Sequence, residues 1–171
     1  MRPRSLLAPT IVAVATCSTL SACGTIAQFG GIEIDIPNKW ESETDGVQTL
    51  AARAERGEWT FVMLSVAKDE VDEGKSLEVI GQEVVAQVAA RDNDGVELSF
   101  GEPEGWSGRD GLGGIQIGGT MSDATRTVQI RLLIVPVRDR YLVAFGYRGP
   151  NADAKDDKAV DKMLASIRGM G

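Results

Sequence analysis

The sequence contains no histidine, and this absence excludes more chemistry than any other feature of its composition. Without imidazole there is no Ser-His or Cys-His pair, no histidine metal ligand, and no side chain that ordinarily titrates near neutral pH. Only two cysteines occur in 171 residues, and both lie within the first 23. We therefore expect a protein that is not an enzyme, has no catalytic residues, binds no metal and uses no cofactor.

Positive charge is also scarce. The chain has 18 Lys and Arg against 25 Asp and Glu, a formal net charge of −7. Loss of an N-terminal leader carrying Arg2 and Arg4 leaves 16 basic residues and a net charge of −9. An acidic protein of this kind is not expected to bind nucleic acid or to attach to anionic lipid headgroups by charge alone.

No apolar run is long enough to span a membrane. Residues 6–20 are apolar but are interrupted by Pro9 and several polar residues, whereas a membrane-spanning helix needs about 20 apolar residues. Because the run follows Arg2 and Arg4, it has the organisation of a secretory signal peptide. It ends in Leu20-Ser21-Ala22-Cys23, which has the pattern of a bacterial lipobox.

Cys23 is the expected lipidation site, because its thiol can take a diacylglyceryl group as a thioether. Cys17 is a weaker acceptor because the branched Thr16 precedes it, and an ordinary secretory signal is the alternative. We expect residues 1–22 to be a lipoprotein signal peptide and residues 23–28 a short lipidated tether, with palmitate-like chains in the cell membrane. At about 3.5 Å per residue, that tether spans some 20 Å. Residues 29–169 would form a single extracytoplasmic domain in the envelope.

The hydrophobic pattern of that domain predicts strands and two helices. The expected strands are residues 31–36, 47–54, 58–67, 96–100, 115–121, 127–137 and 140–147. The expected helices are residues 76–90, capped by Ser76, and a final amphipathic helix that begins after Asn151 and stops at Gly169. Segments 58–67 and 127–137 are apolar on both faces, which predicts strands covered on both sides. Together these elements favour an α+β fold, a mainly antiparallel sheet sandwiched between helices.

Several short motifs then coincide across residues 29–168. They are Ile-x-Ile-Pro-x-x-Trp at 34–40, Ser76-Leu77 at a helix start, Gly113-Gly114-Ile115, the strand Tyr141-Leu142-Val143-Ala144-Phe145, and Met163-Leu164-Ala165-Ser166-Ile167. With this order of elements, the sequence resembles the PsbP-like superfamily, which includes DcrB-type and LpqN/LpqT-type bacterial lipoproteins. The resemblance implies an α/β/α sandwich and a non-enzymatic, partner-binding role. The Ala-, Gly- and Asp-rich composition is typical of a high-GC actinobacterium.

Residues 101–114 are rich in glycine and predict a long surface loop around Trp106. They do not form a nucleophile elbow, because Arg109 stands where that motif needs its second glycine. Nor do they form a dinucleotide-binding loop, which needs a glycine where Gln116 stands. Trp106 and Arg109 are nevertheless the first candidates for partner contact, because exposed Trp and Arg contribute strongly to protein interfaces.

Two functions remain open from the sequence. The first is a protein-binding or scaffolding module, anchored to the membrane, whose partner is an unknown envelope protein. The alternative is a carrier of lipid or another apolar ligand at the membrane surface. A continuous apolar cavity of several hundred cubic ångströms would favour the carrier, and a filled core would favour the protein-binding module.

Overall fold

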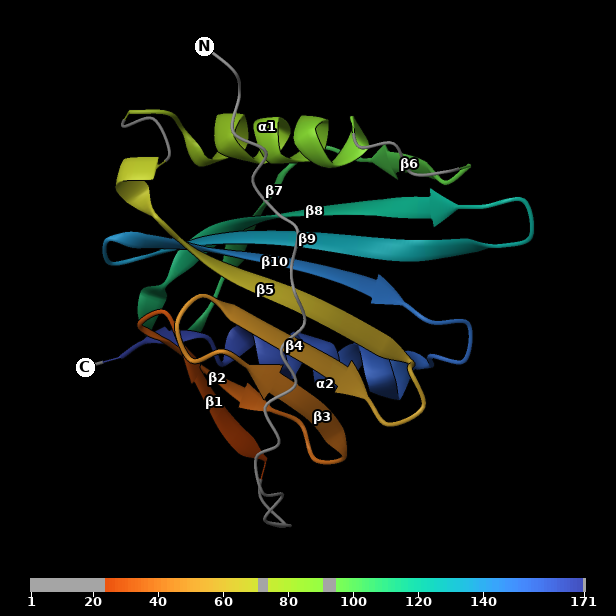
Figure 1. The fold of residues 1–171 in the computed structure, drawn as a ribbon, viewed down its shortest axis with the longest axis horizontal. Helices are drawn as coiled ribbons and strands as arrows, with labels where there is room; N and C mark the ends of the chain where they lie inside the picture. The colour runs from red at the N-terminus through yellow and green to blue at the C-terminus, as the bar shows by residue number, and fades with distance from the viewer. Residues whose placement is uncertain (1–23, 71–73, 91–94, 171) are drawn as a thin grey trace.

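The computed structural model describes residues 24–70, 74–90 and 95–170. These residues form three layers (Figure 1). Helix α1 (Leu77–Ala89) lies on one face of a large antiparallel sheet. Helix α2 (Ala154–Ala165) and a small second sheet pack on the other face. This is the α/β/α sandwich that the hydrophobic pattern predicted.

The large sheet has eight strands, and every pairing in it is antiparallel. Its order is β3-β4-β5-β10-β9-β8-β6, and β7 also pairs with β8. The strands are β3 (Trp40–Thr44), β4 (Thr49–Ala54), β5 (Trp59–Ala67), β6 (Glu97–Phe100), β7 (Glu104–Ser107), β8 (Gly113–Ser122), β9 (Thr127–Val137) and β10 (Arg140–Arg148).

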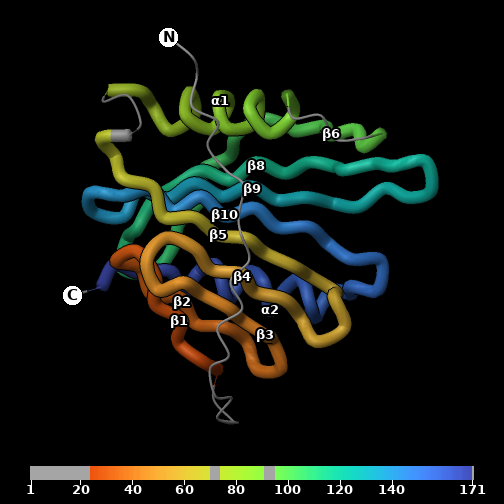
Figure 2. The backbone as a smooth tube through the Cα atoms, viewed as in Figure 1, coloured from red at the N-terminus to blue at the C-terminus, as the bar shows by residue number. Residues whose placement is uncertain are grey.

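The small sheet joins the two ends of the domain. Strand β2 (Ile32–Ile36) pairs with β1 (Thr25–Phe29) on one side and with β11 (Arg168–Gly169) on the other. Figure 2 shows the orange-red β1–β2 hairpin beside the blue C-terminal segment. Arg168 strengthens this junction, because its guanidinium contacts Glu33 and Asp35 on β2, each at 2.9 Å.

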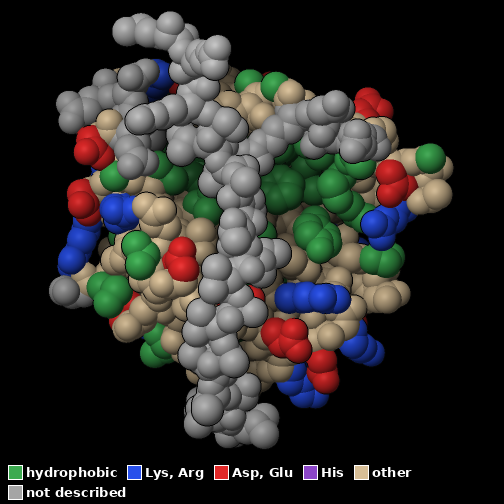
Figure 3. Space-filling model, viewed as in Figure 1, with side chains coloured by type: hydrophobic (Ala, Val, Ile, Leu, Met, Phe, Trp, Pro, Cys, Tyr) green, Lys and Arg blue, Asp and Glu red, His purple; other side chains and the backbone are tan. Residues whose placement is uncertain are grey.

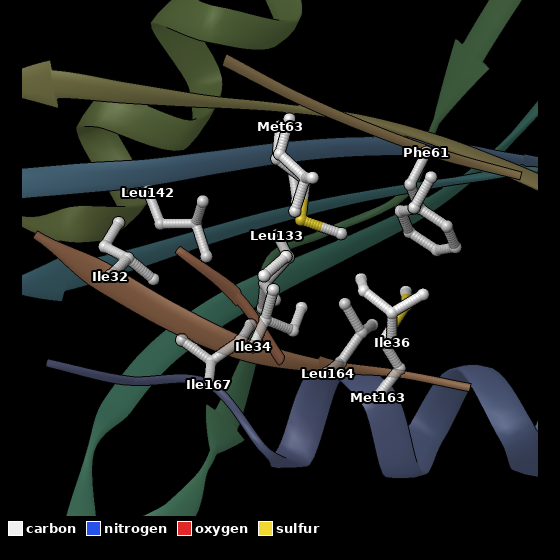
Figure 4. Packing of buried hydrophobic residues seen from close by; sticks show 14 of the residues in the cluster. Ile32, Ile34, Ile36, Phe61, Met63, Leu133, Leu142, Met163, Leu164 and Ile167 are labelled. Atoms are coloured by element: carbon white, nitrogen blue, oxygen red, sulfur yellow. The ribbon is translucent and has the colours of Figure 1, made fainter. Parts of the chain in front are cut away.

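The larger core lies between the two sheets and α2. Strand β2 contributes Ile32, Ile34 and Ile36, each at most 1% exposed, because alternate residues of a strand point to the same face. Figure 4 shows these side chains meeting Met63 and Leu142 of the large sheet. Residues of β1, β4, β5, β9, β10 and α2 complete the same cluster.

Each helix begins at a residue that caps it. Ser76 accepts a hydrogen bond from the backbone of Val79 at the start of α1, as the sequence predicted. At the start of α2, Asp153 and Asp156 form a capping box in which each side chain accepts from the other residue's backbone N–H. Such caps occupy donors that helix geometry leaves unpaired.

A smaller core lies under α1. Ile80 packs on Ile115, Ile117, Leu132 and Ile134 of β8 and β9. Gly81 lets the helix come close, because a Cβ atom there would lie 2.7 Å from Cδ1 of Ile115.

The structure corrects several expected boundaries. Residues 101–114 are not one loop, because β7 forms there and pairs with the start of β8. The final helix ends at Ala165, and residues 168–169 belong to β11. Trp40, whose backbone N–H donates to the carbonyl oxygen of Pro37 at 3.2 Å and closes a turn, begins β3, a strand that the sequence did not predict. These strands are short or polar on one side, so their hydrophobic pattern is weak, and pairing with a neighbouring strand determines them.

Candidate functional site

The outer surface of β5 and β10 is apolar without being fully covered. We call it the open sheet face. It consists of Val62, Leu64 and Val66 on β5, with Tyr141, Val143 and Phe145 on β10. Val62 is 49% exposed, and the other five are half-buried. Figure 3 shows hydrophobic side chains gathered on this side of the molecule, near α1.

Strand pairing brings these side chains together. Val143 lies opposite Leu64, Phe145 opposite Val62, and Tyr141 opposite Val66. Antiparallel partners point to the same face of a sheet, so the six side chains form one continuous surface. The solvent side of an antiparallel sheet is usually polar, and an extended apolar surface is typical of an interaction site.

Helix α1 covers the neighbouring part of the same face. The cluster under it joins Ile80 to residues of β8 and β9, and Tyr141, Val143 and Phe145 of the open sheet face pack against the edge of this cluster. On the far side the surface continues to Ala51 of β4 and then to Glu43 of β3, which follow Val62 in one cross-strand row. The site is therefore an apolar strip with a helix along one side and charged strands along the other.

This arrangement corrects the prediction for residues 58–67. The sequence predicted a strand covered on both faces. Only the face of β5 that carries Trp59, Phe61 and Met63 is fully buried. By contrast, β9 is buried on both faces as predicted, since residues 132–135 are at most 1% exposed. The difference arises because α1 is placed over β8 and β9, a feature that the pattern of β5 itself cannot encode.

Trp106 and Arg109, the candidates from sequence, lie elsewhere. Trp106 is on β7, half-buried, and packs against the larger core. Its ring lies so close to Gly108 that a Cβ atom there would come within 2.3 Å of it. Arg109 is exposed in the following turn. Much of the Trp106 ring is thus engaged within the domain, and their role in partner contact stays a prediction.

A cluster of charged residues surrounds Trp59 at the α2 side of the sheet. The indole Nε1 of Trp59 donates to Oδ1 of Asp157 at 3.0 Å, and Arg148 also donates to that carboxylate. Arg131 lies over the Trp59 ring at 5.6 Å and pairs with Asp161 at 2.7 Å. The contact with Arg148, followed by that with Trp59, holds the pKa of Asp157 below its ordinary value. These charges are paired with one another, which is typical of a structural cluster.

The two cavities described for the domain are open grooves. One, of about 570 Å³, is lined by Trp59, Phe100, Ile130, Arg131 and Asp157, with glycines and polar residues of β6, β8 and β9 and the residues beside them. The other, of about 190 Å³, lies between α1 and β6. Neither is the continuous apolar interior that a lipid carrier needs, so the carrier function stays a prediction without a cavity to support it.

Cys23, the predicted lipidation site, lies outside the described residues, which begin at Gly24. The structure differs from the expected tether of residues 23–28, because Thr25–Phe29 form β1 and pair along their whole length with β2. None of the helices in residues 24–70, 74–90 and 95–170 is long and apolar enough to cross a membrane. Within the same ranges, no group of three His, Cys, Asp or Glu is placed to hold a metal ion.

No family model and no curated protein matches this sequence. The fold, in contrast, matches solved structures. The solution structure of cyanobacterial PsbP (CyanoP) from Synechocystis sp. PCC 6803 aligns with a TM-score of 0.63 at 12% identity, over 91% of this chain and 98% of that one. LpqN of Mycobacterium tuberculosis, described as involved in cell envelope biogenesis, aligns with a TM-score of 0.53 at 13% identity, over 86% of each chain.

A protein from Bacteroides thetaiotaomicron VPI-5482 also aligns, with a TM-score of 0.54 at 12% identity, over 89% of this chain and half of that one. The layers define an α+β sandwich built on an antiparallel sheet. More specifically, the chain has a PsbP-like fold, shared with LpqN. The resemblance inferred from sequence is therefore confirmed at the level of the fold.

Proposed function

We propose that this chain is an envelope lipoprotein, anchored to the membrane through Cys23, which binds another envelope protein on its open sheet face and catalyses no reaction. The lipobox supports the anchor. The shared fold with LpqN, a protein involved in cell envelope biogenesis, supports the location. The observation that carries the binding role is the apolar outer surface of β5 and β10.

The open sheet face lacks the covering layer that a strand apolar on both faces normally has. Segment 58–67 carries apolar residues on both faces, as a strand buried on both sides does. The domain buries one of those faces completely, whereas Val62 on the other is 49% exposed. A flat apolar strip beside α1 suits an amphipathic helix lying alongside it, because helices normally form the layer that covers a sheet. We therefore propose an apolar helical segment of an envelope protein as the occupant.

Photocrosslinking from the open sheet face tests this binding role. A photoreactive amino acid replaces Val62, and the matched control carries it at Val47, an exposed valine in the β3–β4 turn (65% exposed). We expect crosslinks to an apolar segment of one envelope protein from position 62, identified by mass spectrometry, and none to that segment from position 47. Introducing Phe145→Ser into the chain with the probe at 62 should reduce the yield. Equal crosslinking from both positions, or crosslinks only to lipid, would contradict the proposal.

The anchor is tested separately by the intact mass of the protein extracted from membranes. We expect the mass of residues 23–171 with acyl chains attached. A Cys23→Ala variant should leave the membrane fraction. An unacylated wild-type chain would contradict the proposed anchor, whatever the crosslinking shows.

A further inference from the structure

We infer that the end of the domain where β1 begins rests directly on the lipid headgroups, so that the domain has one orientation on the membrane. This inference rests on the acylation of Cys23 in the proposed function. It goes beyond that function because an anchor alone, on a flexible tether, would leave the domain free to turn.

Very few residues separate the anchor from the domain. Strand β1 begins at Thr25, so Gly24 is the only residue between it and Cys23. At about 3.5 Å per residue, Cys23 lies within roughly 7 Å of the strand. Gly24 itself lies against the end of β2, since a Cβ atom there would be 2.5 Å from the carbonyl oxygen of Ile36. The chain between anchor and sheet therefore has almost no slack.

The start of β1 is also held firmly to the domain. Thr25 pairs with Ile36, and the pairing continues without a gap to Phe29 opposite Ile32. Ala27 and Phe29 are buried in the larger core, at 7% and 1% exposure. Lengthening the tether by peeling β1 away would expose both side chains to water, which is unfavourable. The strand thus transmits the position of the anchor to the whole domain.

The residues around this end have side chains that suit a membrane interface. Ile26, the second residue of β1, is 54% exposed. Lys39 is exposed at the tip of the β2–β3 turn, three residues after Ile36, the partner of Thr25. Trp40 beside it is half-buried, because its ring packs on the larger core and stacks on Phe61. The exposed apolar side chain of Ile26 and the lysine, which can extend its ammonium to phosphate groups, are each favoured at the headgroup level.

This orientation turns the open sheet face sideways to the membrane, with β4 and β3 lying between it and the lipid. In Figure 1 the start of β1 lies at the lower end of the molecule, and the face of the sheet beside α1 is turned toward the viewer. The membrane surface would therefore run across the bottom of that view, roughly perpendicular to the open sheet face. The partner segment would approach along the membrane surface, as the part of a membrane protein next to its lipid-embedded region can do.

Depth-dependent quenching tests the orientation. Processing removes Cys17 and acylation blocks Cys23, so an introduced cysteine is the sole thiol in the mature chain. A fluorophore is attached at Ile26→Cys. The matched control carries it at Ala124→Cys, exposed in the β8–β9 turn, which lies at the right-hand edge of Figure 1, away from the lower end where β1 begins. The acylated proteins are placed in vesicles of phosphatidylethanolamine and phosphatidylglycerol containing lipids spin-labelled near the headgroup. We expect several-fold stronger quenching at position 26.

A ten-residue Gly-Ser insertion between Gly24 and Thr25 should abolish the difference while leaving the protein acylated and membrane-bound. Equal quenching at positions 26 and 124 in the acylated protein without the insertion would overturn the orientation and leave the proposed anchor standing. An unacylated chain would overturn the anchor, and the orientation with it, before quenching is measured.

Discussion

Asp157 joins residues that lie far apart in the sequence, since its carboxylate accepts hydrogen bonds from Trp59 and Arg148. Trp59 is buried, so its indole N–H would lose its partner if the carboxylate were removed. Asp161, one turn later on α2, pairs with Arg131 but is mostly exposed (63%). Asp157 therefore holds a buried indole donor, whereas Asp161 makes an ion pair in which it is mostly exposed.

We expect Asp157→Ala to lower the free energy of unfolding by about 1–2 kcal/mol, because it leaves a buried donor unpaired. Asp161→Ala is the matched control and should cost at most about 0.5 kcal/mol, as exposed ion pairs do. Urea denaturation of the two variants measures both values. Equal losses would show that the indole hydrogen bond contributes nothing specific.

Another aspartate, Asp45, organises the turn between β3 and β4. Asp45 accepts hydrogen bonds from the backbone N–H groups of Val47, Gln48 and Thr49, at 2.8–2.9 Å. These contacts, that with Thr49 above all, lower its pKa from 3.8 to about 2. Because the folded-state pKa is below the ordinary one, Asp45 stabilises the fold above pH 4, and this contribution disappears as the pH falls toward 2.

We therefore expect Asp45→Ala to lower the melting temperature near pH 6 and to have progressively less effect between pH 4 and pH 2. Thermal unfolding across that range measures the difference between variant and wild type. A difference that stays constant with pH would contradict the assignment of the effect to the charged carboxylate.

At the scale of elements, the close contact between α1 and β8 depends on Gly81. An alanine there meets the terminal methyl groups of Ile115 at 2.7 Å and Ile117 at 3.1 Å, both at the ends of flexible side chains that can rotate away. Helix propensity favours alanine over glycine by about 1 kcal/mol. We expect Gly81→Ala to be neutral or stabilising and Gly81→Leu to destabilise by about 1–3 kcal/mol through overpacking. The exposed Gln87→Leu on the same helix is the control for Gly81→Leu. Chemical denaturation distinguishes the three variants, and a well-tolerated Gly81→Leu would show that α1 packs loosely.

Element prediction from sequence succeeded where the hydrophobic pattern was strong. Helix α1 begins after Ser76 as expected, and β9 is buried on both faces as its pattern indicated. Strands β1, β3, β7 and β11 were missed, because they are short and, in β3 and β7, mostly exposed. Their backbone hydrogen bonds to partner strands define them, and those partners are set by the tertiary fold.

At the scale of the whole molecule, one core connects both sheets to α2. Leu164 of α2 is 1% exposed in that core, so Leu164→Ala should destabilise by about 2–5 kcal/mol. We expect far-ultraviolet circular dichroism and tryptophan fluorescence to report a single, coincident unfolding transition in wild type and variant. Separate transitions would show that the small sheet and α2 unfold independently of the large sheet.

The candidate site was predictable only in part. The sequence showed that residues 58–67 are apolar on both faces, but it could not show which face stays uncovered. Trp106 and Arg109 drew attention because Trp and Arg are frequent at interfaces, yet the ring of Trp106 lies against Gly108 and the larger core. Exposure depends on neighbours from distant parts of the chain, and local composition does not contain them.

The sequence by itself determined the class of fold, since period-2 and period-3.6 hydrophobic patterns specify strands and helices wherever side chains alternate between water and core. It also determined the absence of imidazole chemistry and the pattern of the lipobox. Only the tertiary structure decided that α1 covers β8 and β9 but leaves β5 and β10 partly open, and that the expected tether is a strand. Both outcomes depend on which segments pack together, because a surface is buried or exposed by partners distant in the sequence.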